Sequence, residues 1–115
     1  MRAMAGGQDL PTPFEVHLTP DRERLLVAPS GELDIATSDQ MQAALLEQFD
    51  NGFAHVVADL RGLTFIDSTG IRTLWQAHQR AAQAGMRLSL IPGNGHVNRA
   101  LRMTGLLELM DLVDR

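Results

Sequence analysis

The stretch His55–Gly85 constrains the fold more than any other part of the chain. It begins with a short run rich in Val, passes through a connecting segment and continues in a helical pattern that ends at Gly85. A short apolar run bounded by turn residues is typical of a strand that is covered on both faces. Because a strand followed directly by a helix is half of a βαβ unit, residues 55–85 predict a buried strand, a turn and a helix.

The helical part of this stretch indicates which side of the helix is buried. Positions with apolar or partly apolar side chains follow the i, i+3, i+4, i+7 spacing of one helix face, and they are Ile71, Leu74, Trp75, His78, Ala81 and Ala82. The opposite face carries Arg72, Gln76, Gln79, Arg80 and Gln83. Gly85 suits the left-handed residue that commonly ends a helix, and Asp67 and Ser68 are both residue types that cap a helix N-terminus.

Ser68 is expected in the first turn of this helix, where backbone N–H groups point outward and the helix dipole is positive. Such a position tolerates a phosphate, and phosphorylation would add about 1.5 to 2 negative charges there. The neighbouring Asp67 would repel this charge, so a surface that docks well without phosphate would be switched off by it. The residue chemistry alone favours a simpler interpretation, in which Asp67–Gly70 is only a helix cap.

The rest of the chain predicts alternating strands and helices. Strands are expected at residues 14–18, at Leu25–Leu33 (antiparallel to the first, and irregular or at an edge near Pro29) and at Arg87–Ile91. A turn is expected at 19–22. A helix with a capping box at Thr37 and Gln40 would bury Met41, Ala44, Leu45 and Phe49 and end at Asn51 and Gly52. A third helix would bury Val97, Ala100, Leu101 and Thr104, and residues 106–110 and 112–113 predict another helical turn and a short strand.

This order, β-β-α-β-α-β-α, requires both hairpin and crossover connections and therefore predicts a mixed sheet of about four to five strands with packed helices. The 115 residues suit one domain,. We expect residues 1–13, with two glycines and two prolines, to be a flexible tail, and residues 14–115 to form the domain,.

Composition excludes several classes of function. The net charge of −4 argues against a general nucleic-acid binder,. All ten positive residues are Arg, so the Lys of a phosphate-binding P-loop and Schiff-base chemistry are both absent,. There is no Cys for a disulfide framework, and no apolar run approaches the roughly 20 residues that span a bilayer,. With no secretory hydrophobic region at the N-terminus, a cytoplasmic location is expected.

Three stretches together resemble the landmark motifs of the STAS domain family, and specifically of its anti-sigma factor antagonists: Gly31–Ala36, Val57–Leu60 and Phe65–Ile71. The resemblance extends from about Phe14 to the end of the chain. It implies a small α/β domain in which the first hydroxyl residue of an Asp-Ser-[Ser/Thr]-Gly motif is phosphorylated by a partner kinase that is also the anti-sigma factor. Ser68 is the matching residue here, with Thr69 as the alternative acceptor, and a PP2C-type phosphatase would reverse the modification.

The resemblance also implies that an acidic residue matching Asp34 helps to form the surface that meets the kinase. From the residues alone, Asp34 is equally well a helix-entry residue that satisfies local amides. Arg72, four residues after Ser68, is positioned either to approach a phosphate or an acidic partner, or simply to be solvated. Asp59 is expected to make hydrogen bonds in the turn after its strand. Trp75 is expected to be core rather than contact, and His78 half-buried.

Three hypotheses follow. In the first, the chain is not an enzyme: its unphosphorylated form binds an anti-sigma factor serine kinase and so frees a sigma factor. This partner surface comprises Glu32, Asp34, Asp67, Ser68, Thr69, Gly70, Arg72 and Gln76. In the second, the chain is a phosphorylation-independent STAS adaptor or subunit of a transporter or signalling complex. A nucleotide-binding domain ranks last, because a phosphate loop is missing. The four His residues lack metal-ligand spacing, and neither a metal nor a cofactor is expected.

Overall fold

The computed structural model describes residues 13–114, so the tail expected at residues 1–13 lies almost entirely outside the described part. Two strands, β1 (Glu15–Asp21) and β2 (Arg24–Leu33), come first, followed by α1 (Ser38–Asp50) and β3 (His55–Asp59). A 3₁₀ turn (Leu60–Gly62) leads to β4 (Leu63–Ile66) and then α2 (Ser68–Gln83). The chain continues through β5 (Arg87–Ile91), α3 (Gly95–Met103), α4 (Leu106–Leu109) and β6 (Asp111–Leu112).

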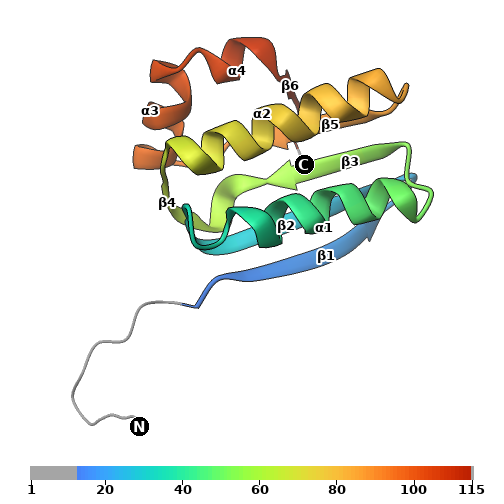
Figure 1. The fold of residues 1–115 in the computed structure, drawn as a ribbon, viewed down its shortest axis with the longest axis horizontal. Coiled ribbons are helices and arrows are strands. Elements are labelled where there is room, and N and C mark those ends of the chain that lie inside the picture. The colour runs from blue at the N-terminus through green and yellow to red at the C-terminus, as the bar shows by residue number, and fades with distance from the viewer. Residues whose placement is uncertain (1–12, 115) are drawn as a thin grey trace, which may run out of the picture.

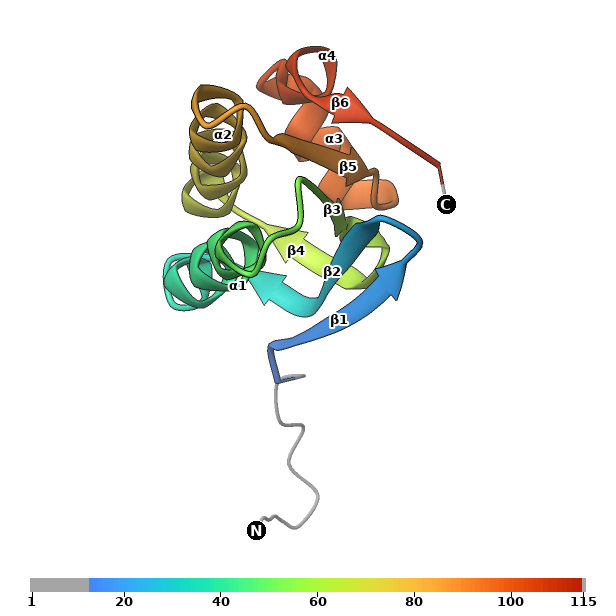
Figure 2. The same ribbon diagram turned by 90° about the vertical axis from the view of Figure 1, so that its right-hand side faces the viewer.

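Within residues 13–114 these strands form one mixed sheet of six strands in the order β1-β2-β3-β5-β6, with β4 paired to β2. The β1–β2 hairpin is antiparallel, and the other pairs are parallel. The predicted α/β class and mixed sheet are confirmed. Figures 1 and 2 show α1 and α2 lying together on one face of the sheet, with α3 and α4 beyond the β5 side.

Strand β4 is the element that the sequence analysis missed, because residues 61–66 were expected to form a connecting turn. β4 continues the sheet where β3 stops: β2 pairs with β3 through Arg24–Val27 and with β4 through Gly31–Leu33. Pro29 lies between these two paired segments, where its missing N–H costs no ladder hydrogen bond on that side. The predicted irregularity near Pro29 is therefore confirmed, since residues 28–30 of β2 pair with β1 on one side and with no described strand on the other. The first turn was also predicted too early, since β1 extends to Asp21 and the turn residue Arg22 has φ 62°.

The main hydrophobic core lies between the sheet and the helices. The predicted face of α1 is confirmed in Met41, Leu45 and Phe49, which are buried, while Ala44 is only partly buried. The predicted face of α2 is wrong by part of a turn. Thr73 and Ala77 are buried beside Leu74 and Ala81, whereas Ala82 is exposed and Ile71, Trp75 and His78 are half-buried. In α3, Val97 and Leu101 are buried, and Thr104 lies just after the helix and is exposed.

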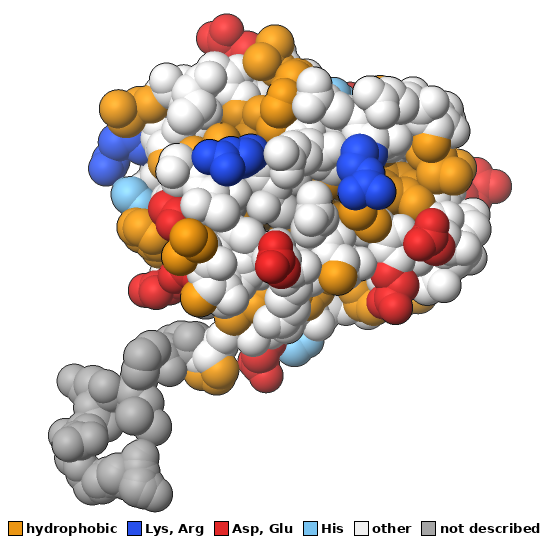
Figure 3. Space-filling model, viewed as in Figure 1, with side chains coloured by type: hydrophobic (Ala, Val, Ile, Leu, Met, Phe, Trp, Pro, Cys, Tyr) orange, Lys and Arg blue, Asp and Glu red, His pale blue; other side chains and the backbone are white. Residues whose placement is uncertain are grey.

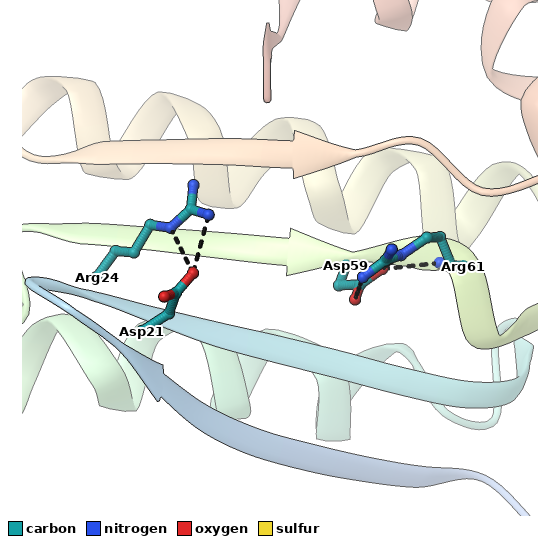
Figure 4. Close-up of polar contacts among 4 residues, drawn as sticks. All are labelled: Asp21, Arg24, Asp59 and Arg61. Atoms are coloured by element: carbon teal, nitrogen blue, oxygen red, sulfur yellow. Dashed lines mark hydrogen bonds and ion pairs between the residues drawn. The ribbon is translucent and has the colours of Figure 1, made fainter. Parts of the chain in front are cut away.

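A smaller apolar cluster occupies the other face of the sheet, where Leu26, Val57 and Ile91 pack with Val113. Figure 4 views this face, with α1 and α2 behind the strands. Two ion pairs stand on it: Arg24 with Asp21 at 3.0 Å and Arg61 with Asp59 at 2.8 Å. The Asp59 side chain also accepts a hydrogen bond from the backbone N–H of Arg61, so the turn role predicted for Asp59 is confirmed.

Candidate functional site

Ser68 stands at the edge of the sheet where β2 and β4 both end. These strands pair in parallel with Leu33 opposite Ile66, and Asp34 and Asp67 are the next residues along each strand. The backbone N–H of Asp67 donates to the carbonyl oxygen of Leu33 at 3.1 Å, which ties the start of α2 to the end of β2. The structure therefore brings the Glu32–Asp34 segment and the Ser68 turn to the same edge, as the sequence analysis expected.

Asp67 is the residue that caps α2. Its side chain accepts a hydrogen bond from the backbone N–H of Gly70 at 3.0 Å, which satisfies one of the amides that a helix leaves free at its N-terminus,. Ser68 is the first residue of the helix and is exposed, while Thr69 is half-buried. Because Asp67 performs the capping, the Ser68 hydroxyl is not needed for it. Among residues 13–114 that hydroxyl has no hydrogen-bond partner.

Gly70 fixes how closely α2 approaches the sheet. A Cβ atom at this position would lie 2.8 Å from both Cγ and the carbonyl oxygen of Leu33, and 2.9 Å from Cγ1 of Ile66. No larger residue fits without moving the helix. The predicted site residue Gly70 is thus buried, and it positions Ser68 rather than offering a contact surface of its own.

The turn between β2 and α1 is held by its own polar groups. Asp34 accepts from the backbone N–H of Ala36 at 2.9 Å, and the Thr37 hydroxyl donates to the carbonyl oxygen of Glu32 at 2.8 Å. Since the Thr37 side chain is used in this turn, it makes no capping bond to α1, and the predicted capping box with Gln40 is wrong. The side chain of Glu32 is exposed, and Ile35, at the tip of the turn, is 80% exposed.

Two further site residues lie along α2. Arg72 and Gln76 are both exposed, about one and two turns beyond Ser68,. Beside them a hollow of about 280 Å³ separates α2 from α4, and Ser68, Arg72, Trp75 and Leu109 are among the residues that line it. The half-buried Trp75 is therefore not simply a core residue, as the sequence analysis expected, because part of it forms the wall of this hollow.

Phe65 and His96 form part of the same edge and were not singled out in the sequence. Phe65 is 37% exposed, and its ring stacks on that of His96 with centroids 5.2 Å apart and planes at 13°. Phe65 pairs with Glu32 across β4 and β2. The sequence could have pointed to Phe65 only if residues 63–66 had been predicted as a strand. An exposed aromatic side chain in a strand beside the site would then have stood out.

A second polar cluster lies away from Ser68, on the face of the sheet opposite α1 and α2. His55 Nε2 and the Ser89 hydroxyl are 2.8 Å apart, the Ser89 hydroxyl donates to Asp111, and Arg87 Nε donates to Asp111 at 2.6 Å. Burial, followed by the charges of Arg87 and Arg24, lowers the pKa of His55 below its ordinary value of 6.5. The hydrogen bonds from Arg87 and Ser89 lower the pKa of Asp111.

This cluster holds the two-residue strand β6 against β5 and does not resemble a hydrolytic site. In a Ser-His-Asp triad the imidazole lies between the other two groups, so that the carboxylate orients it toward the nucleophile. Here the serine lies in the middle, and Ser89 is 0% exposed. A substrate has no access to that hydroxyl.

Another hollow lies at the far end of the sheet from Ser68. It measures about 850 Å³ and is lined by the β1–β2 hairpin and the segment before β3, including Arg22, Arg24 and His55. The Arg24 guanidinium already forms an ion pair with the Asp21 carboxylate. Within residues 13–114, no group of three His, Asp or Glu side chains is placed to hold a metal ion, and no described helix is long and apolar enough to cross a membrane.

Comparison with known proteins identifies the family. The STAS domain model matches residues 15–115, which cover nearly all of this chain. The chain belongs to the STAS domain family. The resemblance inferred from the three sequence motifs is therefore confirmed. Among characterised STAS relatives, the anti-sigma F factor antagonist of Paenibacillus polymyxa is 31% identical over 102 residues, which span 88% of this chain and 87% of that protein.

Solved STAS structures share the fold. An anti-sigma factor antagonist from Mycobacterium paratuberculosis superposes with a TM-score of 0.81 at 19% identity, over 92% of both chains. The anti-sigma factor antagonist SpoIIAA in its unphosphorylated form gives a TM-score of 0.65 at 18% identity, over 90% of this chain and 89% of that one. At these identities the likeness establishes a shared fold.

Proposed function

We propose that this STAS domain is an anti-sigma factor antagonist whose docking is controlled by phosphorylation of Ser68. In its unphosphorylated form it binds an anti-sigma factor that is also a serine kinase, and the sigma factor is released. A PP2C-type phosphatase restores the unphosphorylated form. The domain itself acts by binding rather than by catalysis, and its place of action is the cytoplasm.

The observation that supports this proposal most directly is that Asp67, and not Ser68, caps α2. A serine that only capped the helix would use its hydroxyl on a backbone amide. Here the Asp67 carboxylate accepts from Gly70, and Ser68 is exposed with its hydroxyl unoccupied among the described residues. The simple helix-cap interpretation therefore accounts for Asp67 and leaves Ser68 unexplained, whereas a phosphate acceptor must present its hydroxyl to a kinase.

The same geometry supports Ser68 over Thr69 as the acceptor. Both residues lie in the first turn of α2, but Thr69 is half-buried. A phosphate on Ser68 would stand beside the N-terminal amides of a 16-residue helix, which tolerate its charge,. It would also stand beside the carboxylates of Asp67 and Asp34 at the same edge, so a partner docked there would face a concentrated negative charge and lose affinity.

The proposed docking surface extends beyond Ser68 onto neighbouring residues. Glu32, Asp34 and the exposed Ile35 stand on one side of Ser68, and Arg72 and Gln76 stand on the other along α2. These side chains come from two segments that the β2–β4 pairing holds in register. A rigid surface of this kind loses little conformational entropy on docking, so local charge decides whether it binds.

A capture experiment with two baits tests the proposal. The wild-type domain and Ser68→Asp are immobilised, exposed to native cell lysate, and the retained proteins are identified by mass spectrometry. Retention of an ATPase-fold kinase by the wild type alone is the expected result. Retention of the same partner by both baits, or of a transporter ATPase, contradicts the switch and supports a phosphorylation-independent STAS adaptor instead.

A further inference from the structure

Charge is unevenly divided over the helices of this domain. Helix α1 carries three carboxylates and no arginine. Helices α2 and α3 carry four arginines and no carboxylate: Arg72, Arg80, Arg99 and Arg102. Figure 3 shows Arg side chains along α2 and at the α3 end, with most of the Asp and Glu side chains below them. Helix α4 carries one exposed carboxylate, Glu108. Among the described residues, Arg72 is the one charged residue that lines the groove between α2 and α4, so the groove itself has a positive rim in a chain with a net charge of −4.

The groove between α2 and α4 runs along this surface. Its walls are mostly apolar, from Ile71 and Trp75 on α2 and from Leu106 and Leu109 on α4, and Arg72 and Ser68 stand on its rim. Leu109 is 61% exposed although it is a large apolar side chain. Figure 3 shows hydrophobic side chains gathered above α2 toward α4. The volume of about 280 Å³ is at the lower limit for small-ligand sites and suits a few side chains of a partner,.

We propose that this groove binds one acidic amphipathic helix of a partner protein. Apolar side chains spaced i, i+3 or i+4 on that helix would pack against Trp75 and Leu109, and flanking carboxylates would face Arg72. This is the helix-in-groove mode of recognition, in which an apolar stripe gives affinity and rim charges set specificity. The identification of the partner as the anti-sigma factor rests on the proposed function. The preference of the groove for an acidic amphipathic helix does not depend on that identification.

The acidic character of the occupant also connects the groove to Ser68. Since Ser68 lines one end of the groove, a phosphate there would place about 1.5 to 2 negative charges next to the carboxylates of the docked helix,. Phosphorylation would therefore weaken docking by repulsion, without any change in the shape of the domain.

A second copy of this chain does not meet the requirement. Its most acidic helix is α1, and the apolar face of α1 (Met41, Leu45 and Phe49) is buried in its own core. Helix α4 carries Glu108, but at four residues it is too short to present an i, i+3, i+4 apolar stripe to a groove. What α1 offers outward is charge without an apolar stripe. The occupant is thus a segment of another protein, and a domain that self-associates through the groove would contradict the proposal.

Trp75 makes the test direct, because it is the single tryptophan of the chain and lines the groove. The probe is a hydrocarbon-stapled peptide of about 15 residues, stapled because isolated helices of this length are marginal in water. Leu residues form one stripe and Glu residues flank it. A second peptide has Lys in place of every Glu, and a third has the same composition with the Leu stripe disrupted. Binding to the full chain is followed by Trp75 emission and by NMR shifts of α4 amides.

The acidic striped peptide is expected to saturate the Trp75 signal and to bind at least about tenfold more tightly than either other peptide. Leu109→Glu should weaken it by about tenfold or more, while the matched control Met103→Glu, at an 82% exposed residue outside the groove, should not,. Arg72→Glu should reverse the preference toward the Lys peptide.

Three results would overturn the proposal: no Trp75 response to the acidic peptide, equal binding of the acidic and Lys peptides, or equal effects of Leu109→Glu and Met103→Glu. Concentration-dependent self-association that Leu109→Glu abolishes would do so as well. None of these measurements uses a kinase or a phosphate, so a failure here is separate from a failure of the Ser68 switch.

Discussion

Gly70 lies directly against Leu33, so that a Cβ on Gly70 would stand 2.8 Å from the carbonyl oxygen of Leu33. That carbonyl oxygen also accepts the backbone N–H of Asp67. One residue of β2 therefore sets both the position and the direction of the first turn of α2. Ser68 is presented from a backbone that is fixed on two sides.

Gly70→Ala should destabilise the domain, because the new methyl group would clash with the backbone carbonyl oxygen of Leu33 and with the buried side chains of Leu33 and Ile66. Overpacking of this kind costs about 1 to 3 kcal/mol. Urea denaturation measures the change in the free energy of unfolding, with Ser68→Ala as the control in the same turn. The exposed control should stay within about 0.5 kcal/mol of wild type. Equal stability of Gly70→Ala and wild type would show that α2 does not depend on this contact.

Asp67→Ala should cost about 1 kcal/mol, because the Gly70 amide loses its acceptor at the start of α2,. Asp67→Asn keeps a side-chain oxygen in the same place and should retain most of the stability. Thermal or urea unfolding of both variants checks this. If Asn behaves like Ala, the carboxylate acts through its charge on the helix dipole rather than through the capping hydrogen bond.

The domain should lose stability as the pH falls below 6.5, through His55. The folded state lowers the pKa of His55, chiefly by burial and then by Arg87 and Arg24, and so favours the neutral ring. Between pH 6.5 and that lowered pKa the unfolded chain binds more protons, so the stabilisation present above pH 6.5 disappears as the pH falls,. Asp111, whose pKa is lowered from 3.8, keeps its charge in this range.

Unfolding free energies measured between pH 7 and 5 check the role of His55. The slope with pH should be smaller for His55→Gln than for wild type, and the reduction should exceed that produced by the control Ser68→Ala, which removes no titratable group. A slope that is the same in wild type and His55→Gln would assign the acid sensitivity to other groups.

Ile35→Ser should weaken partner binding without lowering stability. Ile35 is 80% exposed at the tip of the β2–α1 turn, on the Ser68 edge, so its removal leaves no cavity. Complete burial of an Ile side chain on docking is worth about 1.5 to 3 kcal/mol, which corresponds to about tenfold or more in affinity. Calorimetric titration with the captured partner gives this number. Unchanged affinity would place the β2–α1 turn outside the interface.

Much of this architecture could be predicted from periodicity. The strand at His55–Asp59 and the helix after Ser68 follow patterns typical of a buried strand and an amphipathic helix, and both are present,. The face of α2 was wrong in part because Thr73 and Ala77 are buried while Ala82 is not. A polar threonine facing the core and an exposed alanine cannot be assigned by hydrophobicity alone.

Two other errors have local causes. In β4 the burial runs buried, exposed, exposed, buried, so Leu63–Ile66 lack the alternation that marks a strand, and only pairing with β2 makes them one,. At Thr37 the spacing indicated a capping box, but the Thr37 hydroxyl oxygen accepts the backbone N–H of Asp34 instead of an amide of α1, and its proton is donated to the carbonyl oxygen of Glu32,. The groove between α2 and α4 is built from segments distant in sequence, so no local sequence pattern predicts it.

Titration of the captured anti-sigma factor with three forms of the domain tests the central proposal most directly. The forms are wild type, Ser68→Ala and the wild type carrying an authentic phosphate on Ser68, and calorimetry gives the affinity of each. Wild type and Ser68→Ala should bind with similar affinity, and the phosphorylated form should bind at least about a hundredfold more weakly. Equal affinity for all three would contradict the account, because Ser68 would then be an exposed residue of a fixed interface and not its switch.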